Sequence, residues 1–155
     1  LFGIIQEDEY EVAKALRDLG KVITIKKSKN IGIYVINGIK TDIVNYTYPW
    51  LQEPVIKDGL KLAGKKDIAA MKLAAITGRR TKKDFIDLFF LLKKYSLREM
   101  LDLYNEKYDD GSELLVLKSL SYFIDAEKDE PPVILHAVDW NTIKTYIAKQ
   151  LEDIR

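Results

Sequence analysis

The sequence predicts an α+β protein in which one helix and a few strands precede a run of helices. Three runs rich in β-branched residues are separated by the turn pairs Lys29-Asn30 and Asn37-Gly38, and they cover residues 22–25, 31–36 and 39–44. Asn-Gly between two such runs is a strong hairpin signal, so the runs predict a three-stranded antiparallel meander. Beyond residue 66 only helical periods follow, and such segregation of strands from helices is typical of α+β folds.

The helices are expected from apolar residues at helical spacing and from their terminal signals. The first, at residues 8–19, has an apolar stripe of Tyr10, Val12, Leu16 and Leu19, acidic residues at its start and Gly20 as its stop. Ser96 and Glu99 have capping-box spacing, as do Thr81 and Asp84 with Asp in place of the usual Glu or Gln, and Asp139 opens the last helix. The later helices are expected at 66–77, 82–94, 97–107, 112–123 and 139–153.

Two connecting segments and two buried faces complete the expected fold. Residues 46–54 contain two prolines and predict a segment that crosses between lobes, and Asp58-Gly59 predicts a small hairpin. The expected buried faces are Ile68, Met71, Ala75 and Ile76 on the helix at 66–77, and Phe85, Leu88, Phe89 and Leu92 on the helix at 82–94.

Composition limits the classes of function. The 25 basic and 24 acidic residues nearly cancel, so any RNA contact has to come from a local patch. The absence of cysteine excludes disulfide frameworks, thiolate zinc sites and cysteine nucleophiles, and the single histidine disfavours a Ser/His/Asp triad. There is neither an apolar run long enough to span a bilayer nor a signal-peptide pattern. The expected protein is therefore cytoplasmic, without a membrane partner.

The charged stretch Gly78-Arg79-Arg80-Thr81-Lys82-Lys83-Asp84-Phe85-Ile86-Asp87 is the strongest candidate for chemistry. If a helix starts at Thr81, Asp84 and Asp87 are three residues apart and share a face beside four basic residues. Such a cluster can bind a phosphate and its Mg²⁺, and Arg79 and Arg80 can clamp phosphate oxygens bidentately. The alternative is a helix cap with ordinary surface ion pairs, which the residues alone favour because charge runs are usually solvated.

Asp42 and Lys72 are weaker candidates when taken singly. Asp42 lies mid-strand on the same face as Lys40 and Val44, where it is either a functional carboxylate with a partner or an aspartate on a solvated face. Lys72 lies in an otherwise apolar helix, where a lysine normally extends to water. Its functional role would be a single cation directed at a triphosphate.

Together, these motifs resemble the AbiEii/AbiGii-type nucleotidyltransferase toxins of bacterial abortive-infection systems. The motifs that carry the resemblance are residues 39–49, residues 67–73, Gly78-Arg79-Arg80, the Lys-Asp-x-x-Asp stretch from Lys83 to Leu92, residues 120–127 and Val138-Asp139-Trp140. The resemblance implies the end of a polymerase-β-like nucleotidyltransferase core in residues 1–54 and a helical lobe in residues 55–155, with the nucleotide between them. It covers essentially the whole chain.

The resemblance also implies roles for individual residues. Asp42 matches the family's third metal-binding carboxylate, a ligand of Mg²⁺, and Lys72 matches a lysine expected near the phosphates of a bound NTP. Lys83, Asp84 and Asp87 match the Lys-Asp-x-x-Asp motif, whose second aspartate is a candidate for positioning or deprotonating the attacking hydroxyl. Arg79 and Arg80 are further candidates for the phosphates. Asp42, Lys72, Asp84 and Asp87 are thus expected at one cleft.

One family feature is absent from the sequence, which contains neither the glycine turn nor the Asp-x-Asp pair of such cores. Leu1-Phe2 resembles the apolar pair that follows that motif, so we expect an N-terminally truncated chain that is inactive alone. The implied activity of the parent is NMP transfer from NTP to an RNA acceptor, with the 3′ end of tRNA as one candidate. A cognate antitoxin is the implied partner. The alternatives are a non-catalytic module that binds nucleotide, RNA or antitoxin, and a purely structural helical protein.

Overall fold

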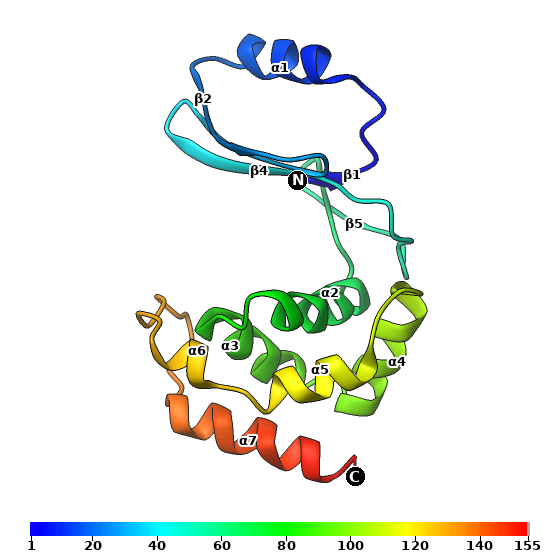
Figure 1. The fold of residues 1–155 in the computed structure, drawn as a ribbon, viewed down its shortest axis with the longest axis vertical. Helices are drawn as coiled ribbons and strands as arrows, with labels where there is room; N and C mark the ends of the chain where they lie inside the picture. Colours follow the sequence, from blue (N-terminus) through cyan, green and yellow to red (C-terminus); the bar gives the residue numbers. More distant parts are fainter. Residues whose placement is uncertain (155) are drawn as a thin grey trace. The chain divides into compact units, whose positions relative to one another are not determined.

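The computed structural model describes residues 1–154, which form two compact units, one from Leu1 to Tyr48 and one from Pro49 onward. The mixed α+β composition expected from the sequence is confirmed. Strands dominate the first unit and helices the second (Figure 1). That the units correspond to the end of a nucleotidyltransferase core and a helical lobe stays a prediction.

The first unit is a four-stranded sheet of order β1-β4-β3-β2 with one helix along it. β2 (Val22–Lys27), β3 (Ile31–Ile36) and β4 (Ile39–Asn45) form the expected antiparallel meander. Asn37 and Gly38 both have positive φ, 48° and 84°, which is the conformation that a tight hairpin turn requires. The short strand β1 (Phe2–Gly3) pairs parallel to β4.

Helix α1 (Glu9–Asp18) begins at Asp8, whose side chain forms a capping box with Glu11. Asn37 ties the end of this helix to the hairpin turn, because its amide accepts from Lys21 N and donates to the Leu19 carbonyl. The expected apolar stripe of α1 is confirmed only in part, and Val12 is partly buried. Leu16 is buried, but Tyr10 and Leu19 are 70% and 64% exposed.

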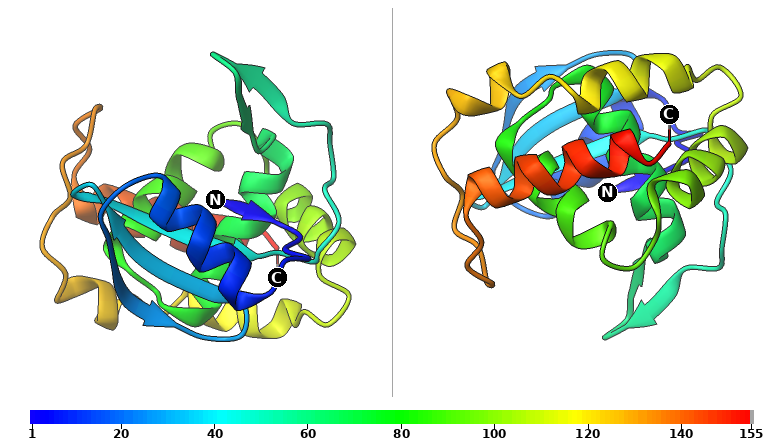
Figure 2. Two further views of the ribbon diagram at one scale, coloured as in Figure 1. Left: turned by 90° about the horizontal axis from the view of Figure 1, so that it is seen from above. Right: turned by 90° about the horizontal axis from the view of Figure 1, so that it is seen from below.

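The second unit begins with a hairpin of β5 (Val55–Lys57) and β6 (Leu60–Leu62), which turns at Asp58-Gly59 as expected. Helices follow in the order α2 (Lys65–Gly78), α3 (Lys82–Leu91), α4 (Leu97–Lys107), α5 (Glu113–Leu120), α6 (Ile124–Glu127) and α7 (Trp140–Glu152). α2 packs on α3, α4 and α5, and α7 packs on α3 and α5. Figure 2 shows α7, in red, running alongside α3 and α5.

Most helix ends follow the local signals, with two exceptions. Ser96 and Glu99 form the expected capping box, and the Asp139 side chain accepts from Thr142 N. The capping box expected at Thr81 is not formed, because the Thr81 hydroxyl donates to the Asp84 carboxylate and does not cap the helix. The expected helix at 112–123 is also divided into α5 and the short α6.

The buried face of α2 differs from the expected one. Ile76 is buried as expected, but Ile68 is 41% exposed, and Met71 and Ala75 are only partly buried. The other buried residues of α2 are Asp67, Ala69, Ala70 and Leu73. The buried face includes an ion pair between Asp67 and Lys107 of α4, with Nζ and Oδ1 2.7 Å apart and both side chains fully buried. Because the Asp67 carboxylate is paired, the face that it shares with the adjacent alanines and Leu73 can lie in the core.

The Asp67–Lys107 pair also fixes the segment that enters the second unit. Asp67 accepts from the backbone amides of Leu51 and Gln52, at 2.9 and 3.2 Å. Lys107 donates to the Pro49 carbonyl at 2.5 Å and lies 4.7 Å from the centre of the Trp50 ring. Each partner therefore holds part of residues 49–52 against α2 and α4.

The apolar stripe of α3 lies in the core as expected, because Phe85, Leu88, Phe89 and Leu92 are all buried. Phe89 also meets Tyr146 of α7 edge-on, with ring centroids 5.2 Å apart. Phe89→Ala should therefore lower the free energy of unfolding by about 3–5 kcal/mol, measured by urea denaturation. Leu114→Ala is the control, because this leucine is 62% exposed on α5. A loss below about 1 kcal/mol for Phe89→Ala would contradict the packing described.

Candidate active site

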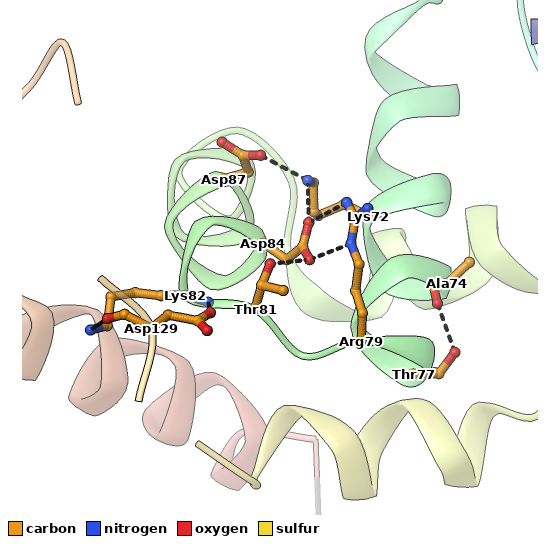
Figure 3. Close-up of polar contacts among 9 residues, drawn as sticks. All are labelled: Lys72, Ala74, Thr77, Arg79, Thr81, Lys82, Asp84, Asp87 and Asp129. Carbon is orange, nitrogen blue, oxygen red and sulfur yellow. Dashed lines mark hydrogen bonds and ion pairs between the residues drawn. The ribbon is translucent and has the colours of Figure 1, made fainter. Parts of the chain in front are cut away.

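Four charged side chains converge where α2 ends and α3 begins (Figure 3). Lys72 Nζ lies 2.9 Å from Asp84 Oδ1 and 2.7 Å from Asp87 Oδ2. Arg79 binds Asp84 bidentately, with Nε 2.8 Å from Oδ2 and Nη2 2.9 Å from Oδ1. The structure therefore brings together four of the candidate residues, and two cations balance two carboxylates.

Helix geometry accounts for this convergence. Asp84 and Asp87 are one turn apart on α3, so they share a face, and Lys72 contacts both. Lys72 and Arg79 are seven residues apart, which is about two turns, so Arg79 at the end of α2 lies on the side of the helix that carries Lys72. The expectation that Asp84 and Asp87 share a face is confirmed. Their roles stay predictions.

Asp84 is the buried centre of the cluster. Its side chain is fully buried, and the Thr81 hydroxyl adds a fourth hydrogen bond to those from Lys72 and Arg79. Burial by itself would raise the pKa of this carboxyl, but the hydrogen bonds from Arg79, Thr81 and Lys72 outweigh burial and hold the pKa well below its usual range. Asp84 is thus an ionised carboxylate that positions two cations.

The low pKa of Asp84 predicts a pH-dependent stability. Because the unfolded chain protonates Asp84 at higher pH than the folded chain does, its contribution is complete above about pH 4 and is lost as the pH falls further. Urea denaturation should show Asp84→Asn less stable than the parent at pH 7, with the difference narrowing toward about pH 3. A difference that stays constant over this range would contradict the ionised state of Asp84.

Asp87 and Arg79 are the accessible members of the cluster, and the Arg79 side chain is 57% exposed. The Asp87 side chain is 57% exposed, whereas that of Lys72 is 14% exposed and is held between the two carboxylates. A ligand that approaches Asp87 therefore meets a carboxylate already bound to an ammonium group. In this pair, the Asp87 carboxylate can accept a hydrogen bond from a hydroxyl of the ligand, and Lys72 offers a positive charge.

Arg80 and Lys83 lie outside the cluster. Arg80 pairs with Asp125 of α6, with Nε 3.2 Å from Oδ2, while its neighbour Arg79 pairs with Asp84. The structure therefore directs the two arginines to different partners. Lys83 is exposed and lines a shallow surface pocket with Thr81, Asp129, Glu130 and Pro132.

Asp42 belongs to the first unit. It lies on β4, pairs in register with Ile33 of β3 and is exposed. Its neighbour Ile43 lines a pocket with Val12 of α1, so strand alternation places Asp42 on the sheet face turned away from α1. That Asp42 acts together with Lys72, Asp84 and Asp87 stays a prediction.

The resemblance implies Mg²⁺, and the described residues supply only part of a site for it. Within residues 1–154 no group of three or more acidic, histidine or cysteine side chains is placed to hold a metal ion. Asp84 is already saturated by donors, and Asp42 is a single exposed strand carboxylate that can supply one ligand. The same residues contain no helix that is both long and apolar enough to cross a membrane.

Sequence reasoning missed two contacts near the cluster. Lys82 is buried, and it donates through its backbone amide to Asp129 Oδ2 and through Nζ to the Asp129 carbonyl. The second contact is the Asp67–Lys107 pair of α2 and α4. Both join residues 40 or more positions apart, so local spacing holds no signal for them, although an acid in the first turn of an apolar helix was visible at Asp67.

Comparison with known proteins places these motifs in a family. The profile of the family described as nucleotidyl transferase AbiEii toxin, type IV TA system, matches residues 42–154. An uncharacterized protein of Aquifex aeolicus (strain VF5) is 37% identical over 126 residues, which cover 79% of this chain and 61% of that protein. The chain thus spans about 61% of the length of this curated relative. No solved structure matches significantly.

Proposed function

Because this chain belongs to the AbiEii family of nucleotidyl transferase toxins, we propose that it is part of a cytoplasmic toxin that transfers NMP from NTP to an RNA acceptor. The candidate acceptors include the 3′ end of tRNA, whose modification would stop translation. The proposal includes a cognate antitoxin as partner and a role in abortive infection, which is a defence against phage. The observation that supports it most is the Lys72, Arg79, Asp84 and Asp87 cluster, which places cations and an accessible carboxylate side by side.

In this proposal each member of the cluster has a distinct task. Asp84 is a positioning residue, because its four hydrogen bonds hold Lys72 and Arg79. Lys72 provides the positive charge for the phosphates, supported by Arg79. The exposed carboxylate Asp87 orients the acceptor hydroxyl and takes its proton. Arg80 and Lys83 add positive charge near this site.

Asp42 is proposed as one metal ligand. Mg²⁺, when bound, would neutralise charge on the phosphates of the nucleotide. Because a two-metal site needs carboxylates that hold both ions, we propose that the 155-residue chain alone does not catalyse transfer. A protein of the relative's full length would supply the remaining ligands.

NTP binding by this chain tests the role of Lys72. Lys72→Ala should weaken NTP binding by about 10-fold or more, because hydrogen bonds to charged groups contribute roughly 1.5–3 kcal/mol, measured by titration calorimetry. Binding of the corresponding nucleoside should change little, since it has no phosphates. Lys66→Ala, at an exposed lysine on the same helix, is the control. Equal NTP affinity in the parent and Lys72→Ala would contradict the assignment.

A further inference from the structure

A pocket with two cationic side chains, Arg80 and Lys118, lies in the helical unit. Its volume is about 300 Å³, and its lining residues are Arg80, Leu115, Lys118, Ser119, Tyr122 and Asp125. None of them belongs to the Lys72, Arg79, Asp84 and Asp87 cluster. From this pocket we propose a binding site for one nucleotide unit of the RNA acceptor, an inference that rests on the proposed transferase function.

The pocket combines the three kinds of contact that a nucleotide needs. Lys118 is exposed and Arg80 is partly exposed, so two cations are available to a phosphate group. Tyr122 is 42% exposed, and with the exposed Leu115 its ring offers an apolar surface to a base. The Asp125 carboxylate, 44% exposed, can accept hydrogen bonds from ribose hydroxyls or base amino groups.

Arg80 is held in place for this role. Its guanidinium lies 5.5 Å from the centre of the Tyr122 ring and pairs with Asp125, so two contacts hold the group. The Arg80 backbone has φ 43°, which is unusual for a residue other than glycine, asparagine or aspartate. Strain of this kind is concentrated at binding sites. An arginine fixed beside an aromatic ring is a stacking platform for an unpaired base.

Ser119 supplies an independent observation. The residue is 2% exposed, and its hydroxyl has no hydrogen-bond partner within residues 1–154. Buried hydroxyls are normally paired, so a polar group in this pocket, or a water molecule that arrives with it, would satisfy the hydroxyl. The net charge of Arg80, Lys118 and Asp125 is positive, which favours an anionic ligand.

Binding of a fluorescent single-stranded RNA with a free 3′ hydroxyl, followed by anisotropy, tests the site. Tyr122→Ala should weaken RNA binding by about 5- to 150-fold, the range found when one stacking ring is removed, and Tyr122→Phe should retain it. Lys118→Glu should weaken binding and reduce the slope of log affinity against log salt by about 0.7 or more. Lys149→Glu, the same charge change at an exposed lysine of α7, should have little effect.

Further measurements distinguish RNA from other ligands, and distinguish this inference from the proposed function. If AMP or CMP competes with the RNA and binds with the same affinity, the ligand is a free nucleotide and the assignment to RNA is overturned. If an acidic peptide binds more tightly than the RNA, the assignment to a nucleotide is overturned. RNA affinity unchanged by Tyr122→Ala and Lys118→Glu overturns this inference, even if NTP binding depends on Lys72. Loss of RNA binding in these variants with unchanged NTP binding supports it. Failure of the chain to bind NTP would count only against the proposed function.

Discussion

Lys107→Met is expected to lower the free energy of unfolding by about 3–5 kcal/mol, the cost of leaving a buried carboxylate without its counter-ion. Asp67 is fully buried, and its other donors are the neutral amides of Leu51 and Gln52. Methionine preserves most of the volume of the lysine stem, so the effect should come mainly from the lost charge. Urea denaturation followed by far-UV circular dichroism gives this value.

Lys144→Met provides the matched control, because Lys144 also pairs with an acid, Glu127, but at the surface, where such pairs contribute about 1 kcal/mol or less. The fluorescence of Trp50 should also change in Lys107→Met, since the ammonium lies 4.7 Å from the centre of the Trp50 ring. Equal losses for the two variants would contradict a stabilising role for the buried pair.

Asp42→Asn is expected to reduce nucleotide transfer by more than about 100-fold in a protein of the relative's full length. Residues that merely support metal ligands change activity by about 10- to 100-fold, so loss of a direct ligand should cost more. Folding should be unaffected, because Asp42 is exposed and asparagine has nearly the same shape. Incorporation of label from an α-labelled NTP into total tRNA measures the effect.

Asp18→Asn is the control for this variant, as it makes the same change at an exposed residue of α1 in the same unit. Transfer by Asp42→Asn at the parental rate would remove Asp42 from the site. Transfer lost equally in both variants would point to folding of the first unit instead.

Local signals predicted much of the fold. The Asn37-Gly38 turn set the register of Ile36 opposite Ile39, because turn chemistry acts over a few residues. The α3 stripe of Phe85, Leu88 and Phe89 and the Ser96 capping box were also confirmed, since each depends on spacing within one helix. The shared face of Asp84 and Asp87 was predictable for the same reason, because it depends only on spacing within one helix.

What the sequence did not predict depends on residues far apart in the chain. The buried face of α2 was predicted wrongly because it includes Asp67, whose partner Lys107 lies 40 positions away. Thr81 does not cap α3 through its side chain, because its hydroxyl donates to Asp84, which Lys72 and Arg79 also bind. In the candidate site, Arg79 and Arg80 could not be assigned different partners from spacing alone.

Catalysis at this site is tested by incorporation of label from α-labelled NTPs into total tRNA, in the presence of Mg²⁺, by a protein of the relative's full length. We expect incorporation by that protein, loss of incorporation in Asp87→Asn, and no incorporation by the 155-residue chain alone. A full-length protein that binds NTP but transfers no label, or an Asp87→Asn variant that transfers it at the parental rate, would contradict nucleotide transfer at this site.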